Sequence, residues 1–202
     1  NEEMTYAGLE DNERIMRVIF SKRKQVAVER RTGRELLRKF ELLGYYDNGN
    51  FRECKLNMNE PCGRCMDCMV YGYAVGDGGA QKSRVLYENA YSVLASQHIT
   101  STKTFNAIYE NGTMRKPGTG QASASINSDK YVIPETYFAD VVTFRDLTEA
   151  EFIYSVGNIL RSRRYGAISS RMGKMTNFIV AIVASNYEVF SSLELTKKIY
   201  DH

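Results

Sequence analysis

The chain has 202 residues, of which 43% are hydrophobic and 25% are charged, a composition that excludes global disorder. Its formal net charge is only +3, so a strongly basic surface requires that lysines and arginines be separated from the acidic residues. The chain contains no run of eighteen apolar residues, which excludes a transmembrane helix, and it lacks a basic-then-apolar leader, which favours a cytoplasmic location.

Residues 14–44 are expected to form the first part of the core. Two short apolar runs around Val18 and Val26 flank the basic residues Lys22, Arg23 and Lys24, and this pattern predicts an extended or kinked strand with charge in its middle. The sequence from Thr32 to Glu35 then matches a capping box, and the apolar residues that follow predict a helix that ends at Gly44.

Residues 45–82 are expected to form a metal-binding insertion followed by a glycine-rich turn. All the cysteines of the chain lie here, at Cys54, Cys62, Cys65 and Cys68. Pairs of cysteines separated by two residues let thiolates in a tight turn face one ion, and four thiolates complete the tetrahedron that zinc prefers. The same spacing occurs in iron–sulfur proteins, so a cluster remains the alternative. A zinc site with these four ligands is closed and is therefore expected to be structural. Disulfides are disfavoured in a cytosolic chain.

The remaining segments complete an α+β pattern. Residues 83–97 predict a core strand, residues 98–130 a long thumb-like β-hairpin insertion, and residues 131–202 the remainder of the core with a C-terminal helix. Within that last segment, Thr148 begins a second capping box and an apolar helix, and the β-branched run at residues 178–183 predicts a buried central strand. The order βαββαβ is that of an RRM-like or ferredoxin-like core.

The residue types argue against catalysis. The chain has only two histidines, His98 and His202, and the predicted metal uses all the thiolates, so acid–base or nucleophilic sites are hard to assemble. A non-catalytic protein is therefore expected. The alternatives left open are a metal-dependent nuclease or RNA-processing enzyme and a zinc-knuckle adaptor that binds another protein.

Two basic, glycine-bearing segments are suited to a sugar–phosphate chain. The first runs from Arg161 to Lys174, where Gly166 and Gly173 let the backbone approach a ligand and arginines can bind phosphates. The second is the predicted finger at residues 111–118, whose Met114 can wedge against bases.

Three motifs in consistent order carry a resemblance to a known family. The Cys-x7-Cys-x2-Cys-x2-Cys pattern that runs into residues 69–79 resembles the backbone subunit of type I-D CRISPR interference complexes, known as Cascade. Residues 109–114 and 158–167 resemble the same family, and the likeness covers residues 14–183. Family members are longer, and the chain begins at Asn1 rather than Met, so flanking pieces are expected to be absent.

The resemblance implies a function and a set of contacts. It implies an RRM-like palm with a thumb and a zinc-bearing subdomain, copies of which polymerise along CRISPR RNA, with other subunits of the complex, and present the guide to the target DNA strand. The implied RNA-binding residues are Lys22, Arg23, Lys24, Met114, Arg115, Lys116, Arg161, Arg163, Arg164, Arg171 and Lys174.

Overall fold

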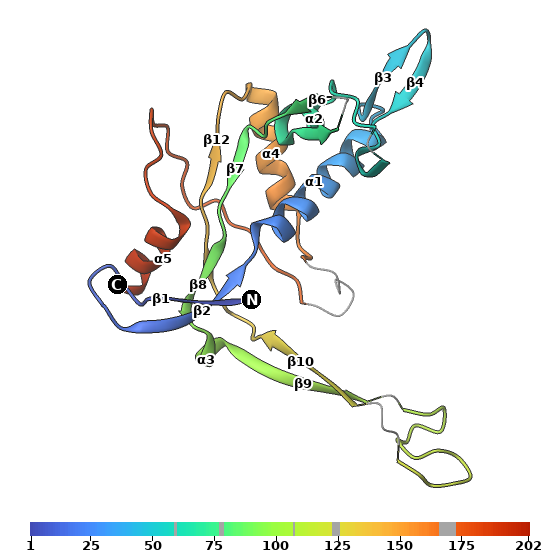
Figure 1. Ribbon diagram of the computed structural model, residues 1–202, viewed down its shortest axis with the longest axis vertical. Coiled ribbons are helices and arrows are strands. Elements are labelled where there is room, and N and C mark those ends of the chain that lie inside the picture. The colour runs from blue at the N-terminus through green and yellow to red at the C-terminus, as the bar shows by residue number, and fades with distance from the viewer. Residues whose placement is uncertain (59, 77–78, 107, 123–125, 166–172) are drawn as a thin grey trace. The chain divides into compact units, whose positions relative to one another are not determined.

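The structure is a computed structural model that describes residues 1–58, 60–76, 79–106, 108–122, 126–165 and 173–202 (Figure 1). The chain divides into two compact units whose segments alternate along the sequence. The first unit comprises Asn1–Ile19, Tyr91–Ala139 and Thr196–His202, and the second comprises Phe20–Ala90 and Asp140–Leu195. None of the described helices is long and apolar enough to cross a membrane.

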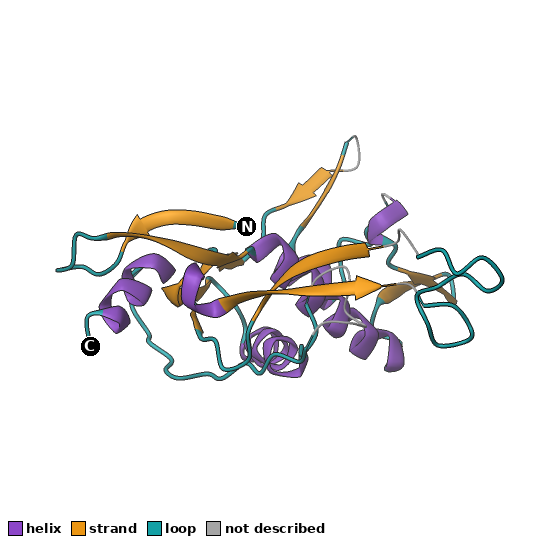
Figure 2. Cartoon of the chain, turned by 90° about the horizontal axis from the view of Figure 1, so that it is seen from below, coloured by secondary structure: helices purple, strands orange, loops and turns teal. Residues whose placement is uncertain are grey.

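The first unit is built on a four-stranded sheet in the order β1-β2-β8-β11. Strands β9 and β10 form a separate long antiparallel hairpin, whose strands lie side by side in Figures 1 and 2. The elements are β1 (Glu2–Tyr6), β2 (Arg14–Phe20), β8 (Ala90–Ala95), α3 (Ser96–Ile99), β9 (Thr100–Asn106), β10 (Ile126–Val132) and β11 (Phe138–Ala139). Helix α5 (Ser192–Tyr200) begins in the second unit and ends in the first.

A buried arginine organises the sheet of the first unit. The Arg17 side chain in β2 is fully buried and donates hydrogen bonds to the carbonyl oxygens of Ser92, at 2.6 Å, and Ala7, at 2.5 Å, and to the Thr5 hydroxyl. The Tyr200 ring of α5 packs over its guanidinium group at 5.2 Å. These contacts join β1, β2, β8 and the end of α5 around one side chain.

The second unit packs three helices against small antiparallel sheets. Its hydrophobic core contains Leu37, Val70, Tyr71, Val85 and Tyr154, and three of the cysteines belong to the same cluster. The elements are α1 (Lys22–Lys39), β3 (Gly44–Asp47), β4 (Asn50–Glu53), the 3₁₀ helix η1 (Leu56–Met58), α2 (Met66–Tyr71), β5 (Tyr73–Val75), β6 (Gly79–Gln81), β7 (Val85–Tyr87), β12 (Val142–Phe144) and α4 (Glu149–Arg161).

Helix α1 begins earlier than the sequence indicates. Lys22, Arg23 and Lys24 form its first turn rather than the middle of a strand, because Ser21 is extended and the helix starts directly after it. Thr32 lies inside the helix, where its hydroxyl donates to the Val28 carbonyl, so the predicted capping box there is wrong. The residues of α1 that are buried are mostly polar, so the sequence shows no apolar helical periodicity over its first turns. They are Lys22, Gln25, Glu29, Gly33 and Leu37.

Two other predictions are corrected. Gly44 does not cap a helix; Phe40 is the C-cap of α1 and Gly44 begins β3, where a Cβ would lie 2.1 Å from the Arg52 carbonyl oxygen. Residues 178–183 form no strand, and Phe178 and Val180 are 74% and 93% exposed, so the predicted buried central strand is wrong. These β-branched residues pair with no strand in the part of the chain that the structure describes.

Other predicted elements are found in whole or in part. Residues 83–97, expected to form one core strand, contain two, β7 and β8, which belong to different sheets, and β9 pairs with β10 within the segment expected to form a hairpin. The Thr148 capping box is present, because its hydroxyl accepts from the Glu151 amide and the Glu151 carboxylate accepts from the Thr148 amide. Helix α5, which begins at Ser192, is the C-terminal helix expected within residues 131–202.

Candidate metal centre and nucleic-acid interface

The four cysteine side chains lie together, as their spacing predicts. All four Sγ atoms lie within 4.8 Å of one another, and the Sγ atoms of Cys54 and Cys68 are 3.5 Å apart. Cys54 directly follows β4, Cys62 and Cys65 lie in the turn before α2, and Cys68 lies inside α2. Three of the thiols are buried and Cys62 is partly exposed.

This donor set fits a single tetrahedral ion. Thiolates bound to zinc at about 2.3 Å stand about 3.8 Å apart, which agrees with the observed separations. The amides of Arg64 and Cys65 point at the Cys62 Sγ atom from 3.4 and 3.2 Å, and the Cys62 amide points at the Cys54 Sγ atom from 3.4 Å. Such donors stabilise thiolate charge. Four protein ligands leave no open position, so an ion held here would be structural.

A buried ion-pair network lies behind the cysteines. The Arg34 guanidinium in α1 donates to Asp67 at 2.8 Å and to the Cys54 carbonyl oxygen at 2.7 Å, and it approaches the Cys54 Sγ atom to 3.6 Å. Arg30 binds the same carboxylate through two nitrogens, at 2.9 and 3.0 Å. Burial lowers the pKa of Arg34, but its hydrogen bonds to Cys54 and Asp67 outweigh that effect and raise the pKa overall. The network fixes α1 to the cysteine segment.

Two basic segments of the second unit are neighbours, one where α1 begins and the other where the chain leaves α4. The rings of Phe20 and Tyr165 meet edge to face with their centroids 5.1 Å apart. Phe20 directly precedes the first turns of α1, and Tyr165 lies just beyond the end of α4, so the contact makes these segments neighbours. Their exposed cations are Arg23, Lys24, Arg163 and Arg164.

The start of α1 is electropositive for a second reason. Its first turn contains no acidic residue, so the positive end of the helix dipole adds to the charge of the cations there. Among the first N–H groups of the helix, the Lys22 amide donates to the Asn89 amide oxygen at 3.1 Å. Anions are favoured at such a helix end.

Lys22 itself is not a surface cation. Its side chain is buried, forms an ion pair with Asp140 and lies over the Tyr87 ring at 5.1 Å. Gln25 donates to the same carboxylate at 3.2 Å. Lys22 is thus placed to join α1 to the segment before β12, and not to contact a phosphate chain directly.

A backbone hydrogen bond joins the two ends of the basic segment that follows α4. The Met175 amide donates to the Arg163 carbonyl oxygen at 2.8 Å, so the two ends of the segment meet. Lys174 is exposed beside this closure, and Arg161 is exposed on the last turn of α4, where it donates to Asn158. Arg171 lies outside the described residues.

The predicted finger residues lie in the first unit. Arg115 and Lys116 are exposed and Met114 is partly buried in the loop between β9 and β10. The loop is turned back on itself, because the Lys116 amide donates to Gln121 at 2.9 Å and the Arg115 guanidinium donates to Gly120 at 3.1 Å. Its cations are available to solvent.

The family model described as Csc2 Crispr matches residues 1–202, the whole chain. The chain belongs to the Csc2 CRISPR family. This confirms the family expected from the cysteine pattern and the two further motifs. No curated protein matches the chain.

A solved structure supports the fold of this Csc2 family chain. The crystal structure of Thermofilum pendens Csc2 matches with a TM-score of 0.68 and 18% sequence identity, covering 98% of this chain and 63% of that one. At this identity the likeness shows the fold alone. The chain therefore spans less than two thirds of the length of the Thermofilum pendens protein.

Sequence reasoning missed several site residues. Asp67, Asp140 and Glu29 are acidic side chains that the structure buries or pairs with cations, and nothing in their local sequence marks them. Asp67 alone offered a signal, because it lies inside the Cys65-to-Cys68 spacing that fixes the cysteine turn.

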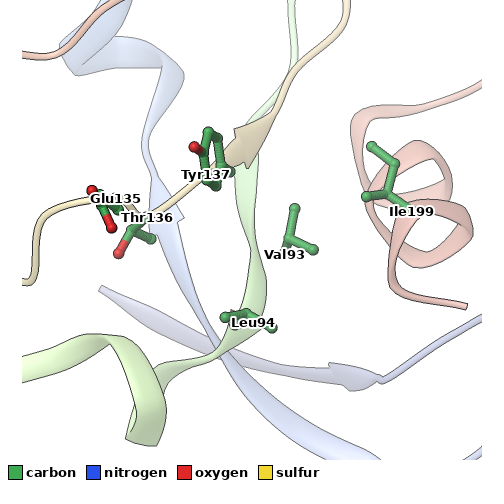
Figure 3. Close-up of a pocket in the computed structure, with 6 residues that line it drawn as sticks. All are labelled: Val93, Leu94, Glu135, Thr136, Tyr137 and Ile199. Carbon is green, nitrogen blue, oxygen red and sulfur yellow. The ribbon is translucent and has the colours of Figure 1, made fainter. Parts of the chain in front are cut away.

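An open apolar groove of about 290 Å³ lies in the first unit (Figure 3). Val93 and Leu94 of β8 and Ile199 of α5 line it together with three residues before β11, Glu135, Thr136 and Tyr137. Glu135 is its only carboxylate, and no histidine, cysteine or lysine lines it. The groove therefore has no acid–base pair.

Proposed function

We propose that this Csc2 family chain is an RNA-binding scaffold subunit of a type I-D CRISPR interference complex. It holds CRISPR RNA through the sugar–phosphate backbone, in repeated copies beside other subunits, and leaves the guide bases to pair with target DNA. The membership of the whole chain in the Csc2 family and the fold shared with Thermofilum pendens Csc2 support this proposal.

The observation that carries the proposal is the meeting of two basic segments at the Phe20–Tyr165 contact. The exposed cations on these segments, Arg23, Lys24, Arg163 and Arg164, are joined by Lys174 at the closed base of the second segment. Clustered cations near a helix N-terminus suit phosphates and carry no base specificity. Arg115 and Lys116 of the β9–β10 loop are further proposed contacts.

The metal and the core complete the proposal. The four cysteines Cys54, Cys62, Cys65 and Cys68 are proposed to bind one zinc ion, which stabilises the segment between α1 and β5. The fold is proposed to include an RRM-like core, and the subunit is proposed to act in a cytoplasmic ribonucleoprotein.

The subunit is proposed to be non-catalytic. The thiolates serve the metal, the apolar groove of the first unit lacks an acid–base pair, and both histidines, His98 and His202, are exposed. RNA incubated with the protein and Mg²⁺ should remain intact. Cleavage that a chelator abolishes would instead establish a metal-dependent nuclease.

Single-stranded RNA binding tests the function directly. The variant Arg23→Glu/Arg163→Glu/Arg164→Glu should lose binding, and the wild-type affinity should fall steeply with salt, by a log–log slope of about −0.7 for each phosphate neutralised. The matched control, Arg52→Glu/Lys55→Glu/Lys82→Glu, reverses three exposed cations elsewhere in the same unit and should bind normally. Equal loss in both variants, or no binding by the wild type, would contradict the proposal; a wild type that binds only protein partners would indicate an adaptor.

A further inference from the structure

We propose that Tyr165 and Asn177 are positioning residues that hold both ends of the basic segment after α4, so that Arg163 and Lys174 are presented in fixed places to a phosphate chain. The inference rests on the proposed function and assigns it residues that touch no ligand themselves. Both side chains are polar; Tyr165 lies inside the basic segment, next to Arg164, and Asn177 lies just beyond its end.

Asn177 ties the returning end of the segment to the end of α4. Its Nδ2 atom lies 2.7 Å from the Ile159 carbonyl oxygen and 2.9 Å from the Ser162 carbonyl oxygen. The last carbonyl groups of a helix have no partner within the helix, so an amide from a distant segment satisfies them as a cap. Asn177 therefore caps α4 from the far side of the basic segment.

Tyr165 ties the outgoing end to the same point and to α1. Its hydroxyl accepts from the Asn177 Nδ2 atom at 2.7 Å and donates to the Glu29 carboxylate at 3.3 Å. Its ring is buried against Phe20. One hydroxyl group thus connects the residues just after α4 with Asn177, beyond the far end of the basic segment, and with α1.

Glu29 is itself held in place. It is 1% exposed, and its second carboxylate oxygen accepts from the Tyr87 hydroxyl in β7 at 2.9 Å. The Ser162 hydroxyl adds a link at the end of α4, donating to the Asn158 carbonyl oxygen at 2.8 Å and lying 3.2 Å from the Thr32 hydroxyl of α1. The described ends of the basic segment are therefore linked to α1, α4 and β7.

These side-chain contacts flank a main-chain closure of the basic segment. The Met175 amide and the Arg163 carbonyl oxygen meet at 2.8 Å between the two anchored side chains. Flanking cations held by such a closure lose less conformational freedom when they bind a phosphate chain, which strengthens binding although no further group touches the RNA.

The test uses Tyr165→Phe and Asn177→Ala in the full chain. Tyr165→Phe keeps the ring against Phe20 and removes only the hydroxyl; Tyr187→Phe removes a hydroxyl from a tyrosine that is 76% exposed and is the matched control. Two quantities are measured: amide hydrogen exchange at Met175, and affinity for an unstructured single-stranded RNA between about 50 and about 200 mM salt.

Both variants should exchange the Met175 amide at least about tenfold faster, because the closure opens more often. They should bind RNA about five- to tenfold more weakly. Their log–log salt slope should be shallower by about 0.7 for each phosphate that the cations no longer neutralise, which reduced stability alone would not produce. Tyr187→Phe should match the wild type in all three measurements.

The outcomes separate the two proposals. A wild type that binds no RNA overturns the proposed function, and with it the role in RNA presentation, whatever the exchange shows. A wild type that binds RNA while the variants keep its Met175 exchange and salt slope overturns the positioning role alone. A lower melting temperature with an unchanged slope counts against positioning in the same way.

Discussion

Arg34 and Asp67 form a buried ion pair, 2.8 Å long, that connects the middle of α1 to the first turn of α2. Because the same guanidinium group also donates to the Cys54 carbonyl oxygen, the pair holds the cysteine before the turn and the helix after it. The candidate metal centre is thereby attached to the longest helix of the second unit.

Removing the Asp67 carboxylate should lower the unfolding free energy of the protein. Asp67→Ala leaves Arg30 and Arg34, whose side chains are only 16% and 12% exposed, without their shared anion. Breaking a buried pair in this way costs about 3–5 kcal/mol of unfolding free energy. The control is Glu53→Ala, which breaks the exposed pair with Arg38 and should cost less than about 1 kcal/mol. Urea denaturation measures both, and similar small costs would contradict the role given to Asp67.

Loss of the metal should unfold the second unit rather than the cysteine segment alone. Cys54, Cys65 and Cys68 belong to the same core as Leu37 and Val85, so removing the ion disrupts that core. Cys65→Ser, or treatment with a chelator, should reduce bound zinc from about one ion per chain to none. Hydrogen exchange should then show fast exchange in α1, with β1 and β2 still protected.

Adding zinc back after chelation should restore protection in α1, which provides the control. Iron with sulfide in the purified protein would replace the zinc assignment with a cluster. Fast exchange that reaches β1 and β2 as well would show that the two units depend on one another for stability.

Two glycines in neighbouring helices should respond to alanine in opposite directions. A Cβ on Gly33 would lie 2.2 Å from the Asn158 amide nitrogen and 2.4 Å from the Tyr154 hydroxyl, so Gly33→Ala should cost about 1–3 kcal/mol by overpacking. In α4, the three atoms nearest to a Cβ on Gly157 all belong to the flexible end of Arg161, the nearest at 3.0 Å. Gly157→Ala should therefore stabilise the protein by about 0.5–1 kcal/mol. Thermal unfolding measures both changes, and the same sign for both would refute the difference in packing.

The buried Glu29 carboxylate should make stability depend on pH. Burial raises its pKa above the ordinary value of 4.5, so between these two values the folded state keeps a proton that the unfolded state has released. The contribution of Glu29 to stability is therefore complete below pH 4.5 and is lost as the pH rises through the folded pKa.

The glutamine side chain of the Glu29→Gln variant does not titrate. The unfolding free energy of the wild type relative to this variant should therefore fall as the pH rises. Urea midpoints across that range measure the difference. Glu35→Gln, which changes an exposed carboxylate on the same helix, should retain the wild-type trend. Parallel curves for wild type and Glu29→Gln would contradict the assignment.

Local chemistry made part of the molecule predictable. The cysteine spacing predicted the cluster because four thiolates within fifteen residues have few other arrangements. The Thr148 capping box was predictable because its determinants lie within a few residues of one another. These elements depend little on the rest of the chain.

Long-range partners explain what could not be predicted. Helix α1 buries Gln25 and Glu29, whose partners Asp140, Tyr87 and Tyr165 come from distant segments, so its apolar periodicity is weak. The family resemblance implied Lys22 as an RNA contact, whereas its partner in the structure, Asp140, lies 118 residues away. Positive charge in a sequence does not reveal which cations are already neutralised.

The exposed run at residues 178–183 has a practical consequence for handling the protein. Six consecutive apolar residues, four of them β-branched and none proline or charged, form the kind of segment that stacks into intermolecular cross-β assemblies. Preparations of the isolated chain should therefore precipitate with a dependence on concentration. A Val180→Lys substitution, at a side chain that is 93% exposed, should keep them in solution without disturbing either folded unit.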